Sequence, residues 1–309
     1  MLDPGELSET LHHLINTNGN IKNVRHLLTQ GANPTYRVRS GATILGRAVQ
    51  LGDPDIIYTL VRHLVDHRTK HPQDAVKYNV DVVDNFGRTP LHYASEKGNP
   101  EAICLLLGAG CTLDPRDNEG IAPIHLATSQ GNETACLALL RSGCKVNLRT
   151  GETYEKVTPL HIAVSRGMDR IAEHLLRYGA KTEIPDYKEQ TPLFVAVSRS
   201  AHDCAKLLIS YGADPNTQQL NGYTALTEAV SYGDKKMTTI LVDGGARPRP
   251  EDRLLHQALS QGCEEVASIL IESGICSLTD TDRVGYSPLH MACQKGLSQS
   301  VTMLLQRGA

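Results

Sequence analysis

Histidine and cysteine are the residue types in this sequence with the clearest capacity for chemistry, and their spacing decides what that chemistry could be. Among thirteen histidines, His63, His67 and His71 are four residues apart, with Asp66 beside them. Residues at this spacing share one face of a helix, where three imidazoles could approach a Zn²⁺ ion. Pro72 and the polar surroundings instead favour a solvated helix end, and no fourth ligand is evident. We therefore expect no metal, and these three histidines are only a weak candidate set of metal ligands.

The eight cysteines do not have the spacing of a zinc site or a disulfide framework, because no C-x-x-C pair occurs. Cys104, Cys136 and Cys204 fall in segments predicted to be helical, where we expect buried, reduced thiols. The chain contains no G-x-G-x-x-G, G-x-x-x-x-G-K-[ST], H-E-x-x-H or G-x-S-x-G motif. We expect no enzymatic activity, no cofactor and no small-molecule substrate.

Five other histidines occupy the fourth position of a repeated hexapeptide that would begin a helix. The hexapeptide reads TPLHYA at 89–94, APIHLA at 122–127, TPLHIA at 158–163 and SPLHMA at 287–292. Its histidines are His92, His125, His161 and His290, with His256 in a weaker copy. Thr or Ser caps a helix by accepting from a free backbone N–H, and Pro is tolerated at the first helical position. The following Leu and Ala would face a neighbouring layer.

A glycine ends this short helix in most copies, as at Gly98, Gly131 and Gly167. A second helix then runs to a leucine pair and a Gly-Ala stop, as in LLTQGA at 27–32 and LLRYGA at 175–180. One such unit cannot bury its own apolar face, so it must stack on its neighbours. The chain is thus expected to be a row of repeats.

This pattern resembles the ankyrin repeat, and the resemblance covers essentially the whole chain. It implies an all-α fold, an ankyrin-repeat solenoid of stacked helix-turn-helix units with short β-hairpin fingers, as a single domain over residues 1–309. We expect about nine units, starting near residues 5, 38, 84, 117, 150, 186, 219, 250 and 282. In this family the motif histidine hydrogen-bonds to the adjacent repeat, which implies a scaffold role for the five histidines.

Two irregular intervals interrupt the repeat. The long interval between Gly52 and Gly98 predicts a polar insertion at 66–82, either as a loop or as an extension of the second helix. A short interval around 248–252 predicts that the eighth unit lacks a full finger.

Ankyrin proteins usually hold their partners in a concave groove formed by the finger tips and the exposed side of the first helices. Carried over to this sequence, that groove includes Phe86, Arg88, Lys97, Arg166, Tyr187, Arg199, Tyr223, Tyr232, Arg283 and Tyr286. The chain has two Phe and eleven Tyr, so five aromatic residues at these positions are more than a solvated surface needs. Tyr and Arg are also the residues that dominate interface hot spots. The alternative is that the tyrosines only pack on neighbouring tips.

Charge and hydropathy exclude several classes of partner. The formal net charge is -3 and basic residues do not cluster, so we expect no nucleic-acid binding. The sequence contains no run of about 18 apolar residues that could span a membrane, and no signal peptide is evident. We therefore expect an intracellular protein that is located in the cytoplasm, or in both the cytoplasm and the nucleus. We expect a monomer whose partners are proteins.

Two functions fit these expectations. The first is a protein-protein interaction module that acts as a scaffold or adaptor. The alternative is the substrate-recognition subunit of a cullin-type ubiquitin ligase, because many ankyrin arrays of this length precede a SOCS box, which here would lie beyond residue 309. The resemblance further implies that Asn147 and Asn216, each with a leucine eight residues upstream, are sites for the factor-inhibiting asparaginyl hydroxylase.

Overall fold

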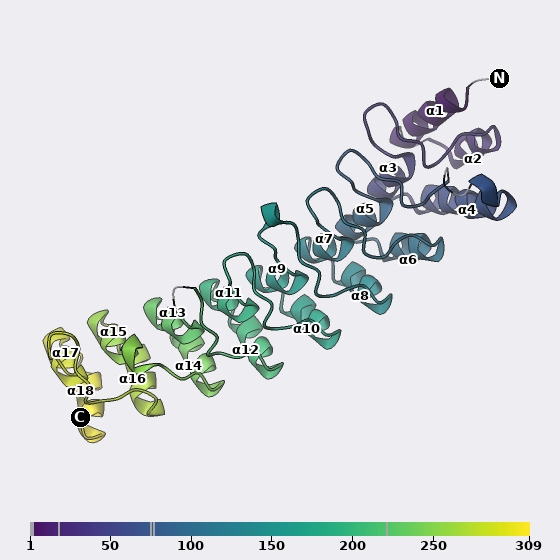
Figure 1. Cartoon of the computed structure of the whole chain (residues 1–309). Helices are drawn as coiled ribbons and strands as arrows, with labels where there is room; N and C mark the ends of the chain where they lie inside the picture. Colours follow the sequence, from purple (N-terminus) through teal and green to yellow (C-terminus); the bar gives the residue numbers. More distant parts are fainter. Residues whose placement is uncertain (1–2, 18, 75, 77, 221) are drawn as a thin grey trace. The chain divides into compact units, whose positions relative to one another are not determined.

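The computed structural model describes residues 3–17, 19–74, 76, 78–220 and 222–309. Within these ranges the chain forms eighteen α-helices, alternately a first and a second helix of a pair (Figure 1). The first helices are α1 (Pro4–Asn16), α3 (Ile44–Leu51), α5 (Pro90–Lys97), α7 (Pro123–Ser129), α9 (Pro159–Ser165), α11 (Pro192–Ser198), α13 (Ala225–Ser231), α15 (Leu254–Ser260) and α17 (Pro288–Lys295). The second helices are α2 (Ile21–Thr29), α4 (Pro54–Lys70), α6 (Pro100–Gly108), α8 (Glu133–Arg141), α10 (Asp169–Arg177), α12 (His202–Ser210), α14 (Lys235–Asp243), α16 (Glu264–Ser273) and α18 (Ser298–Gln306).

The repeated hexapeptide forms the start of the first helices, as the sequence predicts. The Thr191 hydroxyl accepts from the Phe194 N–H at 3.4 Å, and Ser287 does the same for His290 in α17. The proline that follows each cap takes the first helical position. Gly98 ends α5 with a φ of 70°, a left-handed conformation that glycine adopts without strain. The all-α fold predicted from the sequence is therefore confirmed.

The chain divides into two compact parts. The N-terminal body comprises Met1–Ala163 with Arg177–Ala180, and the C-terminal body comprises Val164–Leu176 with Lys181–Ala309. In the N-terminal body, α1, α3, α5 and α7 contact one another in succession, and α2, α4, α6 and α8 form a second row. In the C-terminal body the two rows are α11 to α17 and α12 to α18.

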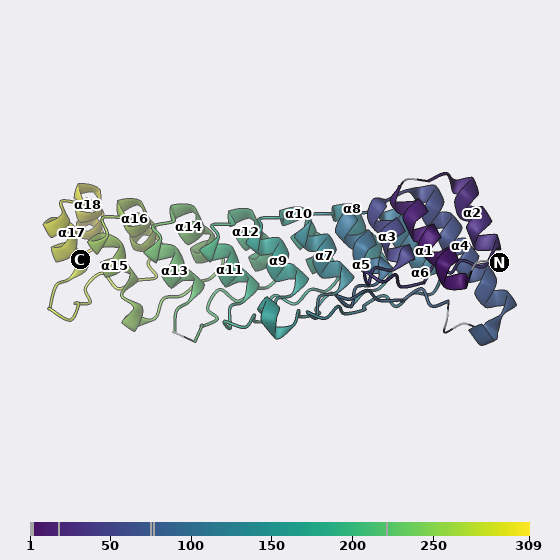
Figure 2. The ribbon, with the colours of Figure 1, turned by 90° about the horizontal axis from the view of Figure 1, so that it is seen from above.

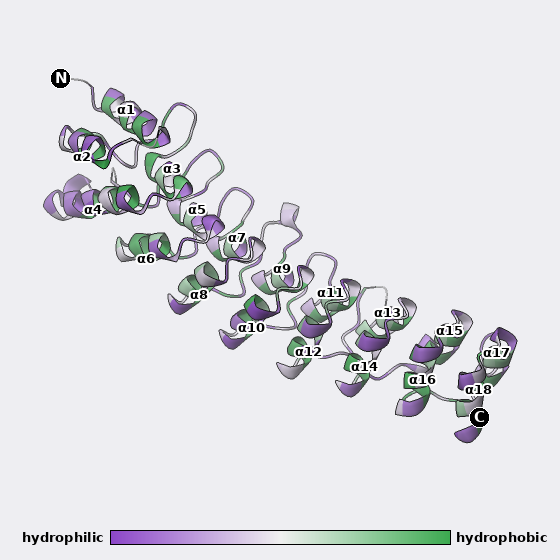
Figure 3. Ribbon diagram, turned by 180° about the vertical axis from the view of Figure 1, so that it is seen from behind, coloured by the Kyte–Doolittle hydropathy of each residue, from purple (hydrophilic) through white to green (hydrophobic). Residues whose placement is uncertain are grey.

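Each body has a thin core between its two rows of helices. Leu91 of α5 and Ile103 of α6 are buried in one, and Leu226 of α13 and Leu241 of α14 in the other. Figure 3 shows the apolar residues concentrated on the helices. In Figure 2, α12, α14 and α16 follow one edge of the C-terminal body, and the loops that we call fingers follow the opposite edge. The nine repeat units and the single array stay predictions.

The fingers differ from the expected β-hairpins. Among the described residues, the β-bridge that occurs is an isolated one between Arg37 and Thr43. The other fingers are tight loops, such as the one that the Asp84 N–H closes by donating to the Arg88 carbonyl at 3.1 Å. In such a loop an aspartate side chain accepts from N–H groups that would otherwise pair across two strands, which disfavours a β-ladder.

The predicted insertion begins as an extension of a helix. Helix α4 has 17 residues whereas α6 has nine, and a 3₁₀ turn, η1 (Pro72–Asp74), follows it. Tyr78 and Val80 return to the core. Residues 75 and 77 of the predicted insertion lie outside the described residues.

Candidate functional site

Three of the motif histidines, His92, His125 and His256, each tie a first helix to the finger that follows. In His92, Nδ1 accepts from the Thr89 N–H, so Nε2 carries the proton and donates to the Ile121 carbonyl at 3.0 Å. His125 and His256 make the same 3.0 Å bond to the carbonyls of Leu148 and Tyr286. Burial lowers the pKa of His125 to about 4, so its ring stays neutral at physiological pH. The scaffold role expected for these three histidines is confirmed.

An aspartate braces the backbone of several fingers. One carboxylate oxygen of Asp84 accepts from the N–H groups of Phe86 and Arg88 at 2.8 and 2.9 Å. In the last finger, Asp282 accepts from Val284 and Tyr286 at the same two distances. Such bracing fixes the backbone at the tip before any partner arrives, which lowers the entropy lost on binding.

Three of the ten predicted contact residues lie in the N-terminal body. Phe86, at a finger tip, is 68% exposed. Lys97 is exposed at the end of α5. Arg88 is already engaged, since its guanidinium lies 3.5 Å from Asp117 and 3.6 Å from Glu96 and its side chain is only 25% exposed. Arg88 therefore braces the surface more than it presents a free charge.

The other seven lie in the C-terminal body and are all exposed. Four are tyrosines, between 44% and 57% exposed: Tyr187, Tyr223, Tyr232 and Tyr286. The remaining three are Arg166, Arg199 and Arg283. These four rings lie on fingers or at the end of a first helix, whereas Tyr211, which is 41% exposed, ends the second helix α12.

Local contacts hold two of these rings without burying them. The Lys188 ammonium lies 5.2 Å from the centre of the Tyr187 ring, within the range of a cation–π contact. A hydrogen bond to Glu228 raises the pKa of the Tyr232 phenol, so the phenol stays neutral. Both side chains remain about half exposed.

Two exposed apolar residues at the tips were missed by the sequence reading. Leu220 is 82% exposed and Val284 is 77% exposed. In the sequence each follows the polar residue that opens a finger and precedes the glycine that closes it, which is Gly222 for Leu220 and Gly285 for Val284. An aliphatic residue inside a polar turn was the available signal, whereas the predicted contact set contains only aromatic and basic residues.

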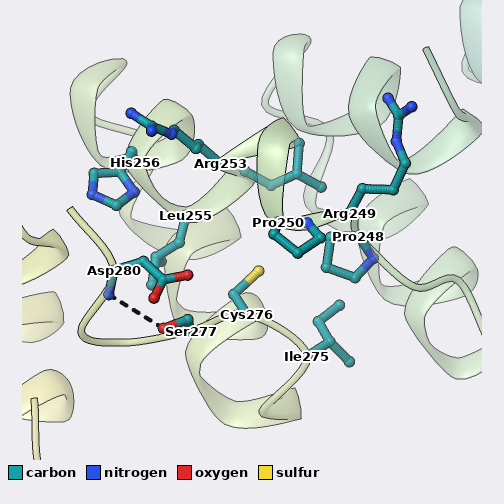
Figure 4. Close-up of a pocket in the computed structure, with 11 residues that line it drawn as sticks. Pro248, Arg249, Pro250, Arg253, Leu255, His256, Ile275, Cys276, Ser277 and Asp280 are labelled. Atoms are coloured by element: carbon teal, nitrogen blue, oxygen red, sulfur yellow. Dashed lines mark hydrogen bonds between the residues drawn. The ribbon is translucent and has the colours of Figure 1, made fainter. Parts of the chain in front are cut away.

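A small cavity lies where the eighth finger is short. The 3₁₀ turn η3 (Pro250–Asp252) replaces the finger, and Arg253 follows it with a left-handed φ of 47°. Figure 4 shows Pro248 and Pro250 beside Ile275 and Cys276, with Asp280 nearby. The cavity holds about 110 Å³. Small-molecule sites usually exceed about 300 Å³, so this one has room for part of a side chain.

His63 and His67 lie in α4 and His71 caps its C-terminal end, but the three rings do not converge on one point. The ring centres of His63 and His67 are 6.2 Å apart, and those of His67 and His71 are 4.8 Å apart. His67 stacks on Tyr78 at 3.8 Å. In the part of the chain that the structure describes, no three His, Cys, Asp or Glu residues are grouped so as to hold a metal.

The cysteines are free, and most are shielded. Burial raises the pKa of Cys136 and of Cys204 to about 11, which disfavours the reactive thiolate. The expectation that Cys104 is buried was wrong, because Ala102, Ile103 and Leu106 take the inward positions of α6 and leave Cys104 exposed.

A comparison with family models decides the family. The model described as ankyrin repeats, in three copies, matches residues 70–150, 124–219, 160–252 and 249–309. The chain belongs to the ankyrin-repeat family. Ankyrin repeats are generally protein-protein interaction modules and are typically not enzymes.

A viral ankyrin-repeat protein is among the similar sequences. An ankyrin repeat protein of fowlpox virus (strain NVSL) is 33% identical over 137 residues. The match covers 37% of this chain and 31% of the relative, so the chain spans about a third of the relative's length. Among the helices described, none is long and apolar enough to cross a membrane.

The two asparagines predicted as hydroxylation sites each link their ankyrin finger to a later part of the same body. The Asn147 side-chain amide donates to the Gly179 carbonyl at 3.0 Å. The Asn216 amide donates to Gly245 at 3.3 Å, and its oxygen accepts from the Arg247 N–H at 2.7 Å. Both asparagines therefore have structural roles in the unmodified chain.

Proposed function

We propose that this ankyrin-repeat chain is a scaffold or adaptor whose C-terminal body binds a segment of a partner protein along its finger tips. The observation that carries the proposal is the set of exposed tyrosines in one body, with Tyr187, Tyr223 and Tyr286 on fingers and Tyr232 at the end of the first helix α13. Soluble proteins rarely gather exposed apolar groups on one surface without a binding role.

The physical basis is the small entropy that such residues lose on binding. A tyrosine ring has two side-chain torsions and buries a large area, and the braced finger beneath it is already ordered. Leu220 and Val284 add aliphatic area at two tips. Arg199 and Arg283 can donate paired hydrogen bonds to carboxylates or carbonyls of the guest.

In the N-terminal body we assign contact roles to Phe86 and Lys97. Phe86 presents an exposed ring at its finger tip, and its backbone carbonyl accepts from the Asn118 N–H at 2.9 Å. Arg88 would position this finger through Asp117.

The test replaces two tip tyrosines and compares them with a tyrosine elsewhere. Tyr187→Ala with Tyr223→Ala should weaken partner binding by about 2 kcal/mol or more, with thermal unfolding nearly unchanged. Tyr211 is a matched control, because it is 41% exposed but ends the second helix α12.

Proteins captured by the wild-type chain are quantified by mass spectrometry, and the affinity of the retained partner is then measured by calorimetry. Loss of the partner with Tyr211→Ala but not with the tip pair would place the binding surface on the second helices and reject the proposal.

The ubiquitin-ligase alternative uses the same surface to hold a substrate. It predicts a SOCS box beyond residue 309, so that a chain that includes this segment captures a cullin, whereas residues 1–309 alone do not. Capture by neither would reject it without affecting the binding role of the tips.

A further inference from the structure

A second surface lies on the opposite edge of the C-terminal body, between the neighbouring second helices α12 and α14 (Figures 1 and 2). An open depression of about 540 Å³ follows these two helices. It is lined by Lys206, Ile209, Ser210, Lys235, Lys236, Thr239, Ile240, Asp243 and Gly244. None of these residues belongs to the finger surface described above.

The floor of the depression is apolar. Ile209 of α12 is half-buried and Ile240 of α14 is buried. Gly244 keeps the floor open, since a Cβ at this position would lie 2.9 Å from two carbon atoms of Ile209. The hydroxyls of Ser210 and Thr239 donate to carbonyls of their own helices, so they add little polarity.

The rim of the depression is basic. Lys206 and Lys236 are exposed and form no ion pair with any described residue. Lys235 pairs with Glu265 at 3.1 Å, and Asp243 is the acidic residue in the lining. Two lysines therefore remain without a partner beside an apolar floor.

The corresponding depression between α4 and α6 in the N-terminal body differs in charge. It is lined by Tyr58, Val61 and Val65, and its arginine, Arg62, lies 3.8 Å from Asp66. That surface is close to neutral, whereas the rim of the α12–α14 depression carries two lysines without an ion pair, so the two depressions differ in charge.

We propose that the α12–α14 depression is a docking site for an acidic segment of a partner protein, in which one or two aliphatic side chains stand next to Asp or Glu. The aliphatic side chains cover Ile209 and Ile240, and the carboxylates pair with Lys206 and Lys236. An enclosed small molecule fits less well, because the depression is open along its length. The site acts independently of the finger tips.

The test selects peptides from a random library displayed on phage. The intact chain is immobilised, and an excess of the Lys206→Glu/Lys236→Glu variant in solution removes peptides that bind elsewhere. Lys22→Glu/Arg25→Glu is the matched control, because it makes the same change of charge on exposed residues of the second helix α2. Circular dichroism checks that each variant keeps its helices.

The enriched peptides should combine aliphatic residues with Asp or Glu. As synthetic peptides they should bind the wild-type chain at least about tenfold more tightly than the Lys206→Glu/Lys236→Glu variant, and the affinity should fall with salt. The Lys22→Glu/Arg25→Glu variant should bind like the wild type, and so should Tyr187→Ala/Tyr223→Ala.

Three results would overturn the proposal. The first is the absence of enriched peptides, and the second is enrichment of peptides without acidic residues. The third is binding of phosphatidylserine vesicles that the lysine reversal abolishes while the peptides bind both chains equally, since that would identify the surface as one for anionic lipid.

Discussion

Buried histidines such as His125 make the stability of the N-terminal body depend on pH. The folded chain holds the pKa of His125 at about 4, whereas an unfolded histidine has a pKa of about 6.5. Between these values the unfolded chain binds more protons, so the free energy of unfolding falls as the pH falls.

We expect this residue alone to contribute about 3 kcal/mol to the loss of stability between pH 7 and pH 4. His125→Gln should make the decline shallower by that order, as measured by urea unfolding at several pH values. The exposed His13→Gln should leave the decline as in the wild type. Equal slopes for His125→Gln and the wild type would show that the ring is protonated in the folded chain.

Side-chain burial at the repeated motif sets a second expectation. Leu160→Ala, at a residue that is 1% exposed, should lower the free energy of unfolding by about 2 to 5 kcal/mol. Arg199→Ala, on an exposed residue, should change it by less than about 0.5 kcal/mol. Denaturant midpoints measure both, and equal shifts would contradict the assignment of inward and outward faces.

Hydroxylation of Asn147 and Asn216 remains a proposal at the residue scale. Incubation with the asparaginyl hydroxylase should add the mass of one oxygen atom per modified site. Because the amides of both asparagines are hydrogen-bonded in the folded chain, the reaction should speed up under conditions that loosen the fingers. Intact mass spectrometry with Asn147→Ala and Asn216→Ala assigns each increment, and an unchanged mass rejects the proposal.

At the scale of the element, disrupting the close contact between successive fingers should measurably lower the free energy of unfolding. A Cβ on Gly120 would lie 2.7 Å from the backbone nitrogen of Gly151, and the Gly151 N–H donates to the Glu119 carbonyl at 2.9 Å. Gly143 has a similar positive φ but no atom within 4 Å of such a Cβ.

Gly143→Ala should therefore cost about 1 kcal/mol from backbone strain alone. Gly120→Ala should cost at least about 1 kcal/mol more, because the neighbouring finger must move. Urea unfolding compares the two variants, and equal costs would mean that the fingers are loosely packed.

Elements were predictable where the signals are local. Capping residue, proline and terminal glycine act within one turn of helix, so the start of α5 at Pro90 and its end before Gly98 follow from the sequence. The insertion was harder to predict, because α4 continues to Lys70 through polar residues. One of these residues, His67, stacks on Tyr78, which lies beyond the end of the helix.

At the scale of the whole molecule, each body is a row in which helices stabilise their neighbours. Helix α5 packs between α3 and α7, whereas α1 contacts only α3 among the first helices described. We expect backbone amides of α5 to exchange with deuterium more slowly than those of α1, because opening α5 disrupts two interfaces. Mass spectrometry of peptic peptides measures this, and uniform protection would indicate one cooperative unit.

The sequence by itself determined the repeat, the all-α fold and the scaffold role of His92 and His125, because these depend on short-range capping and on a pattern that recurs in each unit. Tertiary structure decided which exposed residues remain available. Arg88 is engaged by Asp117 from the following finger, and Cys104 faces solvent. The basic depression depends on Ile209 of α12 packing against Gly244, which follows α14. Such contacts join residues about 30 positions apart, and their geometry is set by how the helices stack, which no local pattern encodes.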